Sequence, residues 1–176
     1  MRSGVRRRAT PVLLAAGNAL APVSSGAPPT DADARTPSAP RRAPDFSRTD
    51  LDHREIRLEA YRGRVVLLNF WATWCEPCIA EIPRFAEWQR KYAGRLQVVG
   101  VSMDDEEAPV RTAYRKYGLN YPVVMGDEKL GEQYGRVLGL PMTFLIDPDG
   151  NIRFQHEGAT DLGLIEKELR GLLPPP

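Results

Sequence analysis

The residues of this 176-residue chain that are suited to chemistry are its only two cysteines, Cys75 and Cys78, which Glu76 and Pro77 separate. Thiols three residues apart fit one helical turn, so they lie close enough to form a disulfide and to break it again. An apolar run at 65–70 directly precedes the pair. A strand that leads into a helix would place Cys75 at the helix start, where the helix dipole stabilises a thiolate. The spacing predicts reversible dithiol–disulfide exchange, and an inert structural disulfide is the alternative.

The rest of the composition excludes other kinds of site. Two cysteines cannot form a multi-bridge scaffold, and they are too few for a four-cysteine zinc site. His53 and His156 lie far from the cysteines in the sequence, so we expect surface or strand positions for them, with a Cys2His2 site left open. The segment 147–151 lacks the later glutamate of a calcium loop and predicts a turn. We therefore expect no metal and no cofactor.

Basic residues are concentrated at the start of the chain. The net charge is +1, but residues 1–42 carry seven Arg and two Asp, and the remainder carries 17 Lys and Arg against 21 Asp and Glu. The folded part is therefore mildly acidic, and we expect no nucleic-acid partner.

The start of the chain also predicts the domain organisation. Residues 1–24 combine four arginines with a short apolar stretch and small residues, the outline of a signal for export. A disordered, Arg-rich extension without an export role is the alternative. Residues 25–42 are rich in Pro and Ala and predict a disordered linker. The domain is expected at 43–173. Export would place it in an extracytoplasmic or periplasmic compartment, with the signal cleaved or retained as a weak anchor.

Hydrophobic periodicity predicts an α/β domain with a mixed central sheet and helices on both faces. The apolar segments 65–70 and 96–101, joined by a helical pattern, predict two parallel strands with a crossover helix. The acidic segment 103–107 is expected to cap a following helix. The full set of predicted strands is 54–58, 65–70, 96–101, 121–125, 143–146 and 152–155, the last two forming a hairpin, and the predicted helices are 77–92, 107–117, 129–134 and 162–173.

Two segments carry a resemblance to a known family. Leu68-Asn69-Phe70-Trp71-Ala72-Thr73-Trp74-Cys75-Glu76-Pro77-Cys78 and the downstream Gly139-Leu140-Pro141-Met142-Thr143-Phe144-Leu145-Ile146-Asp147 resemble the thioredoxin superfamily. The resemblance is specific to its TlpA/ResA-like (DsbE/CcmG-type) branch of extracytoplasmic thiol-disulfide oxidoreductases. It covers nearly all of the predicted domain and implies a thioredoxin-like fold.

The resemblance implies roles for three residues. Cys75 is the expected nucleophile, because free backbone N–H groups of the first helical turn face it. Cys78, one turn further in, is the expected resolving thiol. Glu81 lies on the same helix face as Cys78 and looks like the glutamate that this branch carries after the second cysteine. A partly buried carboxyl there could move the Cys78 proton. An exposed helix glutamate is the alternative.

The resemblance also implies a surface that binds substrate. Pro141 looks like the cis-proline that faces the active site of thioredoxin folds, and it would leave the backbone of Leu140 free to pair with an extended substrate strand. Trp74 is expected to shield the dithiol and to contact partners. Glu76 and Pro77, between the cysteines, complete the expected substrate-binding set. Glu76 also opposes a thiolate, which favours a reductant over a strong oxidant.

The predicted function is reduction of disulfides in client proteins by a monomer. The clients implied by the resemblance are apocytochromes c, and a membrane dithiol donor would recycle the enzyme. A thiol peroxidase of the peroxiredoxin-like group is one alternative, but it needs a threonine where this chain has Ala72. A non-catalytic peptide-binding module with the thioredoxin fold is the other alternative.

Overall fold

The computed structural model describes residues 41–175, so the predicted signal at 1–24 and nearly all of the predicted linker lie outside the described residues. Within that range the main sheet has six strands. In sheet order they are β1 (Arg41–Arg42), β8 (Asn151–Glu157), β7 (Met142–Ile146), β4 (Val65–Trp71), β5 (Leu96–Ser102) and β6 (Val123–Met125). None of the helices in the described part of the chain is both long and apolar enough to cross a bilayer.

The sheet is mixed, as predicted, because two kinds of connection build it. β4, β5 and β6 run parallel, and α1 (Glu76–Lys91) and α2 (Glu107–Lys116) connect them. β7 lies antiparallel between β4 and β8, and a turn at 147–151 joins β7 to β8. The predicted α/β class with a mixed central sheet is therefore confirmed.

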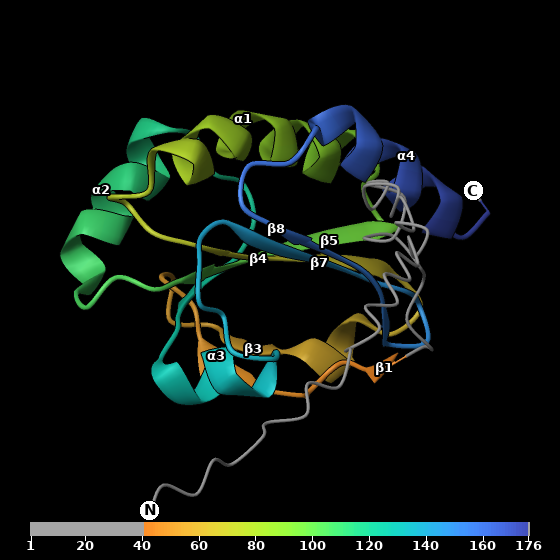
Figure 1. Ribbon diagram of the computed structural model, residues 1–176, viewed down its shortest axis with the longest axis horizontal. Helices are drawn as coiled ribbons and strands as arrows, with labels where there is room; N and C mark the ends of the chain where they lie inside the picture. Colours follow the sequence, from red (N-terminus) through yellow and green to blue (C-terminus); the bar gives the residue numbers. More distant parts are fainter. Residues whose placement is uncertain (1–40, 176) are drawn as a thin grey trace, which may run out of the picture. The chain divides into compact units, whose positions relative to one another are not determined.

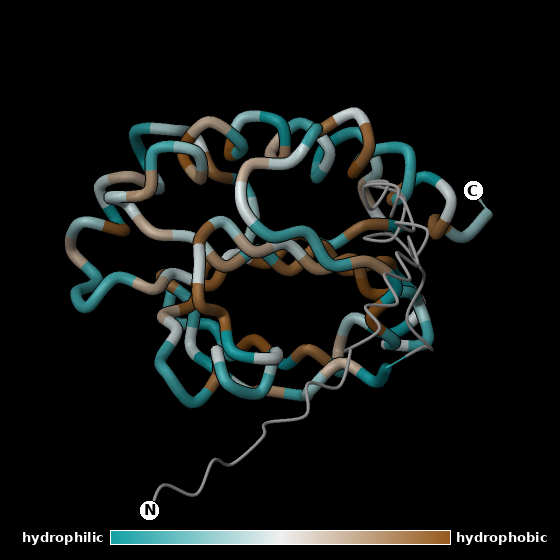
Figure 2. The backbone as a smooth tube through the Cα atoms, in the orientation of Figure 1, coloured by the Kyte–Doolittle hydropathy of each residue, from teal (hydrophilic) through white to brown (hydrophobic). Residues whose placement is uncertain are grey.

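Helices cover both faces of the sheet (Figure 1). α1, α2 and α4 (Leu162–Leu172) lie on one face, and α3 (Glu128–Gln133) lies on the other. β4 explains how the faces are kept apart, since all seven of its residues are buried. Its side chains alternate: Val65 and Leu67 join the core beneath α1, whereas Val66 and Leu68 join the core on the α3 side. Figure 2 shows the hydrophobic stretches concentrated along these central strands.

Aromatic packing attaches α3 to the sheet. Phe70 of β4, Phe144 of β7 and Tyr134 after α3 form a cluster with ring centroids 5.2 to 5.9 Å apart. The Tyr134 hydroxyl donates to the Pro44 carbonyl at 2.7 Å, so its polar end is satisfied although the ring is buried. This cluster holds the C-terminal end of α3 against the sheet.

The structure differs from the sequence-based expectations at the start of the domain. Arg41 and Arg42 pair with β8, two residues before the expected domain start at 43. The expected strand 54–58 is shorter, β3 (Glu55–Arg57), and it pairs with β2 (Ser47–Thr49) in a separate two-stranded sheet. The chain then turns into the short 3-10 helix η2 (Leu58–Tyr61), which buries Leu58. Short strands of polar residues give no clear periodic signal.

Directly after β6, the backbone at Gly126 passes close to the end of β5. A Cβ on Gly126 would lie 2.7 Å from Met103 Sδ and 3.0 Å from the Ser102 carbonyl oxygen. We therefore expect Gly126→Ala to lower the free energy of unfolding by about 1–3 kcal/mol, through overpacking. Gly171→Ala in α4 is the control, because nothing lies within 4 Å of its Cβ, and it should be neutral or slightly stabilising. Urea unfolding measures both variants; equal stability of Gly126→Ala and wild type would contradict the close contact.

Candidate active site

The two cysteines form a disulfide at the start of α1, just after the short loop that follows β4. Cys75 is the N-cap residue, and its Sγ accepts a hydrogen bond from the Cys78 N–H at 3.3 Å. A turn precedes it, closed by the Cys75 N–H donating to the Ala72 carbonyl at 3.2 Å. Pro77 lies in the first turn, where no hydrogen-bond donor is needed. The sulfur that caps the helix is thus also placed among its free N–H groups.

The two sulfur-bearing residues differ in access in the order that the sequence predicts. In the disulfide form Cys75 is 6% exposed and Cys78 is 1% exposed. Both are buried, so the Cys75 side of the bond is only narrowly accessible to a partner. Trp74, directly before Cys75, is 70% exposed, which leaves its indole available to a partner. Glu76 and Pro77 are also exposed.

A second loop lies at the same edge of the sheet as the disulfide. Phe70 of β4 pairs with Met142 of β7, so the segments that follow β4 and precede β7 leave the sheet together. The Leu140–Pro141 bond is cis, as expected. The Pro141 carbonyl accepts from the Gly158 N–H at 2.8 Å, whereas the backbone of Leu140 makes no hydrogen bond among residues 41–175. Leu140 is half-buried and Pro141 is buried. Leu140 therefore presents backbone groups at this edge.

Glu81 is buried one helical turn after Cys78, so the exposed alternative is wrong. It follows Cys78 by three residues in α1 and is 5% exposed. Its Oε2 has no hydrogen-bond partner among the described residues. Burial raises the pKa of Glu81 to about 7, and the backbone N–H of Thr160 partly offsets this effect. A carboxyl with that pKa can hold or release a proton at neutral pH.

The strand beneath the helix contributes no charged side chain at Asn69, four residues before Thr73. Asn69 of β4 is 3% exposed and donates through its side-chain amide to the Thr143 hydroxyl at 3.0 Å. The neutral pair is satisfied within the core. The buried acid on the helix side of the site is therefore Glu81, which belongs to α1 and not to the sheet.

Asp104 is a site residue that sequence reasoning missed, because the segment 103–107 was expected to cap α2. The N-cap of α2 is Glu106, which makes no capping side-chain bond. Asp104 instead accepts hydrogen bonds from the N–H and the hydroxyl of Thr73, at 3.0 and 2.5 Å. An aspartate two residues after the end of a buried strand is the available signal, since the loops after parallel strands leave the sheet at the same edge.

The remaining polar candidates have structural surroundings. Asp147 and Asn151 close the predicted turn, with the Asn151 N–H donating to Asp147 Oδ1 at 2.8 Å. His156 Nε2 lies 2.7 Å from Glu168 Oε2, across β8 and α4. Within residues 41–175 no group of three or more His, Cys, Asp or Glu side chains is arranged to hold a metal ion.

Comparison with known proteins identifies the family. The matching family model is the AhpC/TSA family, over residues 40–155. The thiol-disulfide oxidoreductase ResA of Bacillus thuringiensis subsp. konkukian is 35% identical over 138 residues, which cover 76% of this chain and 78% of ResA. The chain therefore belongs to the AhpC/TSA thioredoxin-like family.

Solved structures of this family support the same assignment. A candidate thiol:disulfide interchange protein DsbE from Chlorobium tepidum superposes with a TM-score of 0.70 at 30% identity, over 78% of this chain and 99% of that one. The exposed lipoprotein thioredoxin Etrx1 of Streptococcus pneumoniae gives 0.62 at 29% identity, over 73% and 100% of the two chains. With its paired cysteines, this family member is a thiol-disulfide oxidoreductase of the ResA/DsbE type.

The raised pKa of Glu81 predicts a pH dependence of stability. Between the usual pKa of 4.5 and the folded value of about 7, the folded protein retains a proton that the unfolded chain has released. Stability present below pH 4.5 is therefore lost as the pH rises through 7. Glu81→Gln should lack this part of the slope. Urea unfolding of the oxidised protein from pH 4.5 to 8 measures it, with the exposed Glu87→Gln as control. Equal slopes for Glu81→Gln and wild type would contradict the burial effect.

Proposed function

We propose that this oxidoreductase reduces disulfides of client proteins outside the cytoplasm, and that apocytochromes c are its clients. The observation that carries the reductase role is the Cys75–Cys78 pair at the helix start, with the buried carboxyl of Glu81 three residues beyond Cys78. Nucleophile, resolving thiol and proton acceptor then lie on two successive turns of one helix.

The proposed reaction moves two electrons from the dithiol to the client. The Cys75 thiolate attacks one sulfur of the client disulfide, a mixed disulfide forms, and the first client sulfur leaves as a thiolate that takes up a proton. Glu81 takes the Cys78 proton, and the Cys78 thiolate attacks the Cys75 sulfur. The internal disulfide forms and the second client thiol is released. A membrane dithiol donor then returns the pair to the reduced state.

Charge near Cys75 supports a reducing role. Glu76 occupies the first turn of α1 and is exposed beside the nucleophile. Its negative charge disfavours the Cys75 thiolate, and strong oxidants depend on a stabilised thiolate. The dithiol therefore holds its electrons less firmly than a strongly oxidising pair would.

Client binding is proposed at the edge that the two loops share. Trp74 offers a large exposed apolar surface, and Leu140 offers backbone groups that an extended strand could pair with. Glu76 and Pro77 border the same disulfide, and Pro141 fixes the loop that carries Leu140. Contacts of this type bind backbone and apolar side chains, so they suit an unfolded client segment better than a folded surface.

Two findings support the proposed location. The chain resembles an exposed lipoprotein thioredoxin of known structure, and its first residues have the outline of an export signal. Disulfide reduction outside the cytoplasm needs a client whose cysteines must be free, and the cysteines that receive haem in c-type cytochromes meet this requirement.

A thiol peroxidase remains the second enzymatic candidate from the sequence, and the site gives it less support. The position that needs a threonine is Ala72, which is buried and carries no hydroxyl group. A peroxide-consumption assay on the reduced protein separates the two activities, and we expect turnover no faster than for a free thiol.

Trapping of the mixed disulfide tests the proposed function. Cys78→Ser should hold clients on Cys75, because the resolving thiol is gone. We expect apocytochrome c among the proteins captured in cells, and loss of mature cytochrome c when Cys75 is replaced by serine. The double variant Cys75→Ser/Cys78→Ser is the matched control and should capture none. Normal cytochrome c maturation in a deletion strain would contradict the proposed client.

A further inference from the structure

Asp104 joins the end of β5 to the loop that carries the nucleophile. β5 ends at Ser102, which pairs with Trp71 at the end of β4. The Met103 N–H continues this contact by donating to the Trp71 carbonyl at 2.8 Å. Asp104 is the next residue, and it reaches Thr73, two residues before Cys75. The contact therefore crosses between two neighbouring strands at the edge where the disulfide lies.

The side-chain oxygens of Asp104 accept hydrogen bonds from three donor groups. Its oxygens accept from the Thr73 N–H, the Thr73 hydroxyl and the Ser102 hydroxyl, the last at 2.7 Å. All three partners are donors, and the residue is only 9% exposed. An asparagine of the same shape would replace one acceptor oxygen by an NH2 group, so one hydroxyl partner would have to accept instead of donate, and the negative charge would be lost.

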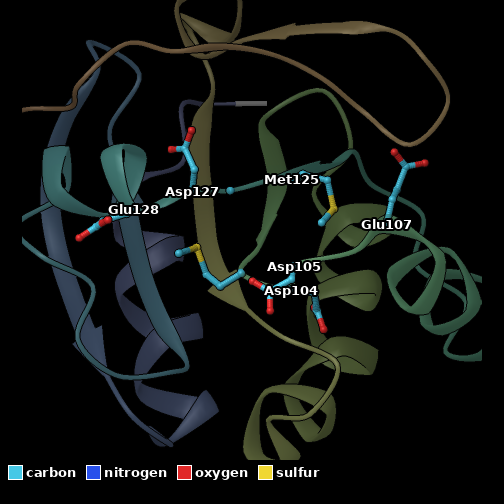
Figure 3. A pocket seen from close by; sticks show the side chains of 8 residues that line it. Asp104, Asp105, Glu107, Met125, Asp127 and Glu128 are labelled. Carbon is cyan, nitrogen blue, oxygen red and sulfur yellow. The ribbon is translucent and has the colours of Figure 1, made fainter.

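The charge of Asp104 has no cationic partner among the described residues. No salt bridge within residues 41–175 includes it. It also borders an open pocket of about 490 Å³ whose other charged lining residues are all acidic: Asp105, Glu107, Asp127 and Glu128. Figure 3 shows Asp127 and Glu128 on one side of this pocket and Glu107 on the other. Hydrogen bonds, and not an ion pair, hold Asp104 in place.

Thr73 lies inside the turn that sets the position of Cys75. This turn runs from Ala72 to Cys75 and is closed by one backbone hydrogen bond of 3.2 Å. In the oxidised protein the disulfide also restrains Cys75. After reduction that covalent restraint is absent, and the contact between Asp104 and Thr73 still links the loop to β5 through a side chain.

We propose that Asp104 is a positioning residue that holds the Cys75 loop in the reduced protein and thereby keeps the dithiol strongly reducing. A reduced loop that is already held in place loses little conformational entropy when the disulfide forms. Disulfide formation is then favoured, and the pair gives up its electrons readily. The negative charge of Asp104 acts in the same direction, because it disfavours the Cys75 thiolate. The inference rests on dithiol exchange and does not depend on the identity of the client.

The equilibrium with glutathione tests this proposal. We expect Asp104→Asn to shift the equilibrium constant about tenfold toward the dithiol form, which corresponds to a reduction potential about 30 mV less negative. Thr73→Val, which removes only the hydroxyl, should shift it in the same direction by less, and Thr73→Ser should match wild type. Asp105→Asn is the control, since Asp105 is the adjacent exposed aspartate, and it should stay within twofold of wild type.

Thermal unfolding of the oxidised and reduced forms shows whether Asp104 stabilises the reduced loop in particular or both redox forms equally. A carboxylate that supported both redox forms equally would lower both melting temperatures and leave the potential unchanged, and that result would overturn the proposal. An unchanged potential in Thr73→Val would overturn it as well, which keeps the test decisive if Asp104→Asn does not fold. Failure to capture apocytochrome c would leave these measurements unaffected.

Discussion

The junction between β4 and α1 is the constraint on which the site depends. Cys75 is the N-cap of α1, so the residue that starts the helix also carries one sulfur of the disulfide. Three hydrogen bonds hold this junction. The Cys75 N–H donates to the Ala72 carbonyl, the Cys78 N–H donates to Cys75 Sγ, and the Thr73 N–H donates to the Asp104 carboxylate. Because β4 is buried along its whole length and paired on both sides, the junction has a rigid base.

Charge around the disulfide is distributed unevenly, and the distribution matches its chemistry. Glu76 directly follows Cys75, and Asp104 contacts Thr73, two residues before Cys75, so both place negative charge on the Cys75 side, whereas Glu81 lies three residues after Cys78 as a buried carboxyl with a pKa of about 7. The sheet beneath carries the neutral Asn69–Thr143 pair. In the proposed reaction this distribution disfavours a strongly stabilised Cys75 thiolate and gives Cys78 a proton acceptor.

Much of the fold and the main site residues could be predicted from the sequence because their signals are local. The apolar run at β4 and the two-thiol spacing both follow from neighbouring residues, and the structure has the strand and the disulfide there. Asp104 could not be assigned, because its partner Thr73 lies 31 residues away. The acidic segment around it reads equally well as a helix cap. β1 and β2 were missed since short pairings of polar residues depend on the partner strand.

Equilibration of the wild-type protein in thiol–disulfide buffers, with the fraction of Cys75–Cys78 disulfide measured at each potential, is the most direct test of dithiol exchange at this junction. We expect one two-electron transition between about −320 and −200 mV, the range of cellular reductants and exchangers. A pair that stays fully oxidised throughout that range would be a structural crosslink, and it would contradict an exchanging thiol at the start of α1.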